Sequence, residues 1–155
     1  MKLTCKLQLK IIKDFMKGKT PKFWGFGEKT AISTDGVVAA IFDPEELVFD
    51  LSMDQCVELG SHMDKYYKLF EKASPVKRTM EYKVLDYYLL EKFHCDENEP
   101  FDVYIQKKLA DKFPNCDFFA VSPTDPIFAV LPFGGPVGMI MPVKTPVKTG
   151  MEGSK

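Results

Sequence analysis

The sequence is poor in the residues and segments that mark several common classes of protein. Only two of its 155 residues are histidine and four are cysteine, and Cys5, Cys56, Cys95 and Cys116 form no Cys-x-x-Cys pair. Neither a zinc site nor a disulfide framework is therefore predicted. The apolar runs are far shorter than the ~20 residues of a membrane helix, and the first residues lack the apolar core of a secretory signal. We expect a cytoplasmic chain without membrane contact, metal or cofactor.

The residues that are present fit a single folded unit with unevenly placed charge. Apolar residues make up 45% of the chain and aromatic residues 13%, enough for one hydrophobic core. Residues 1–29 contain eight lysines and two acids, whereas residues 41–64 contain seven acids and no lysine or arginine. This asymmetry predicts one basic and one acidic surface, which would suit binding of a polyanion or head-to-tail association of copies.

Two regions read as antiparallel strands joined by short turns. In the first, strands at 22–27 and 29–34 are followed by Asp35-Gly36 and a third strand at 37–42. An Asp-Gly pair strongly predicts a hairpin turn, because Gly adopts positive φ at little cost. In the second, from Cys116 to Lys144, apolar runs at 117–121, 127–131 and 137–143 alternate with turns rich in Pro and Gly. Each region predicts a three-stranded meander.

The helix predictions rest on apolar periodicity. Residues 3–9 alternate like a half-buried strand, and the period then changes to helical over 10–17, ending at Gly18. A capping-box pattern at Ser52 and Gln55 predicts a long helix over 53–73, whose stripe includes Met63, Tyr67 and Phe70. Residues 77–93 fit a strand or a helix equally. A further helix is predicted to begin at Asp102 and to bury Val103, Ile105, Leu109 and Phe113.

Two segments, in this order, resemble the bacterial DNA sliding clamp, the β subunit of DNA polymerase III. Residues 30–39 (TAISTDGVVA) are similar to its strand, Thr-Asp-Gly turn and strand, and residues 138–144 (GMIMPVK) to its closing strand with a Met-Pro-hydrophobic-basic ending. The resemblance covers about two thirds of the chain, with residues 44–99 divergent or inserted. It implies one α+β, DNA-clamp-like domain over 1–144, with antiparallel sheets outside and helices inside, and a flexible tail at 145–155.

The resemblance also implies a function that needs no catalytic site. Clamps act in DNA replication or repair by encircling double-stranded DNA and by binding peptides of partner proteins, so a single domain here would need to form a homo-oligomer. The DNA-contacting residues carried over are Lys10, Lys13 and Lys17. The peptide-binding residues are Thr34, Gly36, Val37, Met141, Pro142 and Val143, drawn in the family from neighbouring domains and therefore expected here to come from two subunits.

Other interpretations remain open from sequence alone. The chain would also suit a small protein–protein interaction module that mimics or regulates a clamp and binds no DNA, and lysines on the exposed side of a helix are common without any ligand. A hydrolase using His94, Cys95 and nearby acids would have to recruit distant partners. Trp24, with its aromatic neighbours Phe23 and Phe26, would suit stacking on bases or packing in the core.

Overall fold

The computed structural model describes residues 6–47, 56–97 and 99–143, and these are organised around one open ten-stranded sheet. Its order is β4-β1-β2-β3-β10-β9-β8-β5-β6-β7, and every neighbouring pair is antiparallel except β1 and β4. This confirms an α+β class with mainly antiparallel pairing. The strands are β1 (Lys22–Phe26), β2 (Lys29–Ser33), β3 (Val38–Phe42), β4 (Val57–Glu58), β5 (Ser74–Leu85), β6 (Tyr88–Cys95), β7 (Phe101–Gln106), β8 (Asp117–Ala120), β9 (Ile127–Leu131) and β10 (Gly135–Ile140).

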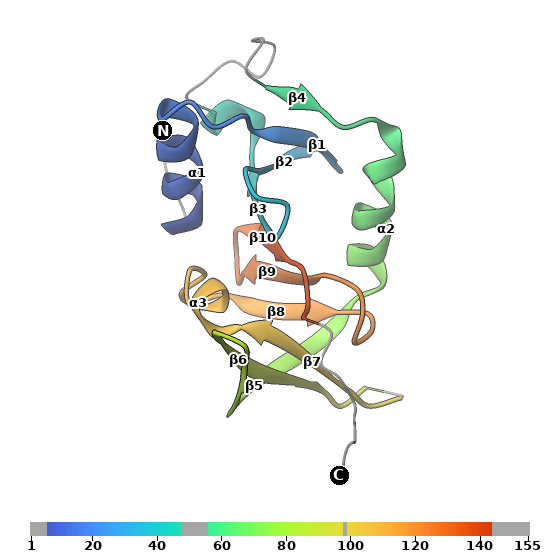
Figure 1. Ribbon diagram of the computed structural model, residues 1–155. Helices are drawn as coiled ribbons and strands as arrows, with labels where there is room; N and C mark the ends of the chain where they lie inside the picture. The colour runs from blue at the N-terminus through green and yellow to red at the C-terminus, as the bar shows by residue number, and fades with distance from the viewer. Residues whose placement is uncertain (1–5, 48–55, 98, 144–155) are drawn as a thin grey trace.

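Helices cover both faces of the sheet. α1 (Lys6–Met16) and α3 (Lys107–Ala110) lie on one side, and α2 (Asp64–Lys72) lies on the other (Figure 1). The short 3₁₀ helices η1 (Pro44–Glu46) and η2 (Ser61–Met63) precede β4 and α2, respectively. The expected two-layer arrangement, with strands outside and helices inside, is therefore wrong for this chain, because α2 adds a third layer.

The central strand β3 shows why the sheet needs cover on both faces. All five of its residues are buried, and successive side chains of a strand point to opposite faces. Val38, Ala40 and Phe42 enter the core that α1 and α3 cover. Ala39 and Ile41 enter the second core, which η2 and α2 cover with Met63, Tyr66, Tyr67, Leu69 and Phe70.

The sheet contains two similar units, each of one helix and three strands, that meet at β3 and β10. In chain order one unit is α1-β1-β2-β3 and the other is α3-β8-β9-β10. β3 and β10 pair antiparallel through Ala39 and Met139, so the strand order runs outward from this seam as β3-β2-β1 on one side and β10-β9-β8 on the other. Both predicted meanders are confirmed, and this seam joins them into one sheet.

The N-terminal prediction of a strand over 3–9 is wrong where it can be compared, because α1 already begins at Lys6; residues 1–5 lie outside the described part. Leu7 and Ile11 are buried one turn apart against the sheet, as in an amphipathic helix. Gln8, which strand alternation would expose, is buried, and its Nε2 donates a hydrogen bond to the Ile41 carbonyl at 2.8 Å. Because this hydrogen bond satisfies the side-chain amide, Gln8 can be buried between α1 and the sheet.

The predicted long helix over 53–73 is shorter in the structure, although its apolar stripe is correct. Residues 53–55 and the Ser52 cap lie outside the described residues, and α2 begins only at Asp64. Before it, Val57 N donates to the Pro21 carbonyl at 2.9 Å and Leu59 N to the Phe23 carbonyl at 2.8 Å. Backbone pairing along the edge of β1 therefore replaces helix over 57–59. Residues 44–99 also supply β5 and β6, so this segment belongs to the sheet.

The helix predicted from Asp102 is wrong over its first half. Residues 101–106 form β7, paired with β6, and only four residues then form α3. Val103 and Ile105 are buried, as predicted, but they alternate on one face of a strand, which suits β-branched side chains. The ambiguous segment 77–93 lies in the β5–β6 hairpin. The predicted tail at 145–155 lies outside the described residues.

Candidate functional site

The β2–β3 turn has a defined shape because its polar groups are satisfied locally. Asp35 Oδ1 accepts hydrogen bonds from Val37 N at 2.9 Å and Val38 N at 3.2 Å. Ser33 Oγ accepts from Gly36 N at 2.9 Å and donates to the Val38 carbonyl at 2.8 Å. Gly36 has φ +78°, a value that a side chain would strain. The turn is therefore a rigid support for the side chain of Val37.

The C-terminal segment that follows β10 is joined to this turn within the same chain. Met141 N donates a hydrogen bond to the Val37 carbonyl at 2.8 Å. The two segments that carried the sequence resemblance thus meet in one subunit. The expectation that they would meet only between two subunits is wrong for the described residues.

An apolar pocket of about 220 Å³ lies where the turn, β10 and α2 approach one another. Its walls come from both ends of the chain and from η2 and α2, so no local sequence pattern encodes it. Three methionines line it, and their flexible thioethers adapt to differently shaped ligands. The lining residues are Lys22, Trp24, Ser33, Gly36, Val37, Val38, Ala39, Leu59, Met63, Tyr66, Met139 and Met141.

The pocket contains three of the six residues expected to bind peptide, namely Gly36, Val37 and Met141. Thr34 points elsewhere: its Oγ1 donates to Asp14 Oδ2 on α1 at 3.0 Å. Pro142 does not line the pocket, and Val143 N donates to the Tyr104 carbonyl of β7 at 2.8 Å. The closing segment leaves the pocket after Met141, so the last two predicted residues are not part of it.

Trp24, the only tryptophan of the chain, forms part of the pocket wall. It is 5% exposed, and its ring centroid lies 6.3 Å from that of Tyr66. Its indole Nε1 is buried and has no hydrogen-bond partner among the described residues, an arrangement that typically costs about 1–3 kcal/mol. The predicted core role of Trp24 and Phe26 is confirmed, because both are buried in the core under α2. Base stacking on them would require this core to open.

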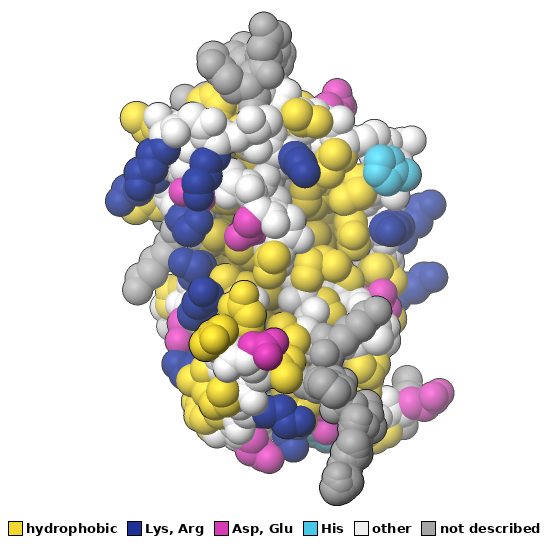
Figure 2. Space-filling view, viewed as in Figure 1, with side chains coloured by type: hydrophobic (Ala, Val, Ile, Leu, Met, Phe, Trp, Pro, Cys, Tyr) yellow, Lys and Arg dark blue, Asp and Glu magenta, His cyan; other side chains and the backbone are white. Residues whose placement is uncertain are grey.

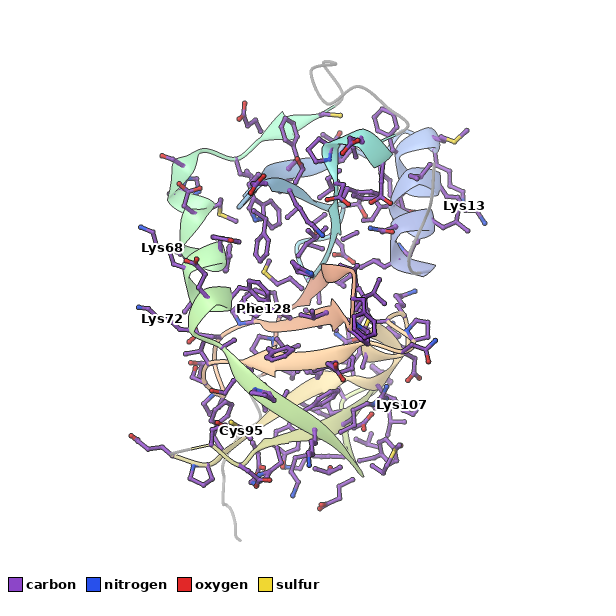
Figure 3. All side chains as sticks on the ribbon, turned by 180° about the vertical axis from the view of Figure 1, so that it is seen from behind. Lys13, Lys68, Lys72, Cys95, Lys107 and Phe128 are labelled. Atoms are coloured by element: carbon purple, nitrogen blue, oxygen red, sulfur yellow. The ribbon has the colours of Figure 1, made fainter. Side chains whose placement is uncertain are left out.

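Of the three predicted DNA-contacting lysines, Lys10 and Lys13 lie on α1 and Lys17 directly follows its end. Lys10 Nζ donates to Asp14 Oδ2 at 2.7 Å, and this hydrogen bond is the main reason that the pKa of Asp14 is lowered. Lys13 and Lys17 are exposed, and neither forms an ion pair within the described part of the chain. Figure 3 shows Lys13 extending from α1 on the side opposite Lys68 and Lys72 of α2.

A second basic segment, missed in the sequence analysis, lies beside these lysines. Lys108 of α3 and Lys112 just after it line a hollow of about 350 Å³ together with Lys10 of α1. Lys and Arg side chains accordingly gather over α1 and α3, along the left of Figure 2, with apolar side chains beside them. The signal was present in the sequence as Lys107-Lys108, but no sequence pattern showed that this segment would lie beside α1.

The residues considered for a hydrolase do not form a nucleophile and base. His94 Nδ1 lies 2.7 Å from Asp102 Oδ1 and its Nε2 lies 2.9 Å from Asp96 Oδ1; hydrogen bonding to Asp102 is the main cause of its raised pKa. Cys95 is 1% exposed and belongs to the core under α1 and α3. The described residues contain no cluster of three or more potential metal ligands.

Two further observations bear on function. None of the described helices has the length and apolar character of a membrane span. Comparison with protein-family models, curated proteins and solved structures finds no match for this chain. The pocket and the lysines over α1 and α3 are therefore the features from which a function is inferred.

Proposed function

We propose that this chain is a non-enzymatic, clamp-like binding protein whose apolar pocket accepts a short peptide of a partner protein. The observation that carries the proposal is the pocket formed by Val37, Met141 and Trp24 within one subunit. Its rim is built on a rigid turn and its floor on a buried sheet, so the site exists before a ligand arrives. Pre-formed apolar pockets with few polar groups are typical of ligand sites.

The size and chemistry of the pocket favour peptide side chains over a charged cofactor. Its volume suits one or two apolar side chains, and among the described residues that line it Lys22 is the only Lys, Arg, Asp or Glu. Burying a Leu and a Phe together contributes about 3–6 kcal/mol before the loss of peptide entropy is subtracted. After that subtraction we expect a short apolar peptide to bind weakly, with Kd about 1 mM or weaker.

Trp24 provides the test, because a ligand in the pocket changes the surroundings of the only indole. The hexapeptide Ac-GSLFSG-NH₂ is titrated into the protein while tryptophan emission is recorded, with Ac-GSSSSG-NH₂ as the control. We expect a saturable change with the apolar peptide alone. Equal responses to both peptides, or none to either across a panel with Met, Ile or Trp in the central positions, would overturn the proposed pocket function.

A second proposed role is contact with double-stranded DNA along α1 and α3. It is favoured by the approach of Lys10, Lys108 and Lys112 around one hollow, with Lys13 on α1 and Lys17 directly after its end. Encirclement would require several copies, because the sheet of one chain is open. The alternative, a module that binds only protein, would use the pocket without this surface.

Salt dependence and solution mass separate these two roles. If Lys13, Lys17 and Lys112 each neutralise one phosphate, log K for duplex DNA falls with log salt with a slope of about −2.7. Replacing Lys13 and Lys17 by Ala should reduce this slope, whereas replacing Lys68 and Lys72 on α2 should not. Absence of any duplex binding at low salt would leave only the protein-binding role, and a monomer at micromolar concentration would exclude a stable ring.

A further inference from the structure

The tip of the β5–β6 hairpin presents two tyrosines to solvent. Tyr87 is 100% exposed and Tyr88 is 46% exposed. Asp86 adopts φ +56° in the two-residue turn between Leu85 and Tyr88, as expected for a tight hairpin. Tyr is enriched at binding interfaces, because its ring packs against a partner while its hydroxyl stays in water, and neither tyrosine belongs to a core cluster.

Ionic contacts at the base of the hairpin position it against α3. Arg78 of β5 contacts the fully buried Glu91 of β6 and, at 2.9 Å, Asp111 just after α3. Asp111 also accepts from Lys107 at 2.7 Å, and this bond is the main cause of its lowered pKa. Arg78 therefore ties the base of the hairpin to the end of α3, and nearer the tip Lys108 of α3 lies against the ring of Tyr88.

Two open hollows run from the hairpin tip towards α1, and they share the residues Tyr88, Gln106 and Lys108. The outer hollow, about 540 Å³, adds Tyr87, Leu89, Lys107 and Asp111. The inner hollow, about 350 Å³, adds Lys10, Asp35, Val37, Leu109 and Lys112. Together they form a trough with four lysines and two aspartates, and with aromatic rings at one end. Both aspartates are engaged, Asp35 by backbone N–H groups and Asp111 by Arg78 and Lys107.

We propose that this trough binds single-stranded nucleic acid. Proteins that hold single strands combine a positively charged groove along the backbone with aromatic faces on which bases stack. Lys108 Nζ lies 5.8 Å from the centre of the Tyr88 ring. A cation and an aromatic ring therefore lie side by side, as the phosphate and the base of a nucleotide do. Unstacked bases are required, because a paired base does not present its face to Tyr87. The trough shares Val37 with the peptide pocket, but the proposal does not depend on peptide binding.

The test is fluorescence anisotropy with a fluorescein-labelled oligo(dT) of twenty nucleotides at low salt, with a duplex of the same length for comparison. We expect the single strand to bind and Tyr87→Ala to weaken it about tenfold. Tyr82→Ala is the matched control, because Tyr82 lies on the same hairpin but lines neither hollow. Its affinity should stay within twofold of the wild type.

The lysines are tested through the salt dependence of the same binding. Replacing Lys108 and Lys112 by Ala should make the slope of log K against log salt shallower by about 1.4, because each contributes about 0.7 for a single strand. The same change at Lys68 and Lys72, on the opposite side, should leave the slope unchanged. The proposal is overturned if Tyr87→Ala and Tyr82→Ala bind oligo(dT) with the same affinity. It is also overturned if the duplex binds as tightly as oligo(dT) and Tyr87→Ala weakens the binding of both by the same factor.

Discussion

Placing a carboxylate at the rim of the apolar pocket should abolish most of its affinity for the GSLFSG peptide without unfolding the protein. Val37 is 36% exposed, and its structural role is carried by its backbone, which bonds to Asp35 and Met141. Val37→Glu therefore keeps the turn and changes only what a ligand meets. Val84→Glu is the matched control, because Val84 is exposed on the β5–β6 hairpin and lines neither the apolar pocket nor the outer or inner hollow.

The magnitude follows from two losses that add. A ligand covering the remaining exposed part of Val37 gains about 1 kcal/mol from buried apolar area, which the variant gives up. Covering a carboxylate without a hydrogen-bond partner costs at least about another 1 kcal/mol. A total near 2 kcal/mol corresponds to roughly thirtyfold weaker binding.

The assay is titration followed by Trp24 emission, with urea unfolding of each variant as the check on stability. The free energy of unfolding of Val37→Glu should lie within about 1 kcal/mol of the wild-type value, as expected for a surface substitution. If it binds the peptide as tightly as Val84→Glu does, the ligand does not cross this rim, and the assignment of the pocket is refuted.

Two further predictions concern the fold itself. A Cβ on Gly138 would lie 1.9 Å from a ring carbon of the buried Phe113, so Gly138→Ala should lower the free energy of unfolding by about 3 kcal/mol in urea titrations. Gly25 has open space around it, so Gly25→Ala should change the free energy of unfolding by under about 1 kcal/mol. Similar losses for both variants would refute the close packing. Asp102 raises the pKa of His94, so this pair contributes stability below the unfolded pKa near 6.5 that is lost as pH rises through the folded value. The stability difference between wild type and His94→Gln should therefore shrink from pH 6 to pH 8, and a difference that does not vary with pH would contradict the ion pair.

Local chemistry was enough to predict some parts of the fold. The turn at Asp35-Gly36 and the strands on either side follow from residues adjacent in sequence, because a positive φ and a bonded Asp side chain need no distant partner. The C-terminal meander followed for the same reason. By contrast, apolar alternation at Leu7 and at Val103 was compatible with two periods, and only the neighbouring elements decided between them.

The sequence by itself determined the turns, the meanders and the apolar character of residues 30–39 and 138–144. Only the tertiary structure decided that Val37 and Met141 share one pocket with Tyr66 of α2, and that Lys10 lies beside Lys108. The physical reason is the seam between β3 and β10, which brings together segments about a hundred residues apart. Contacts across such a distance depend on which faces are buried, and no local periodicity records that choice.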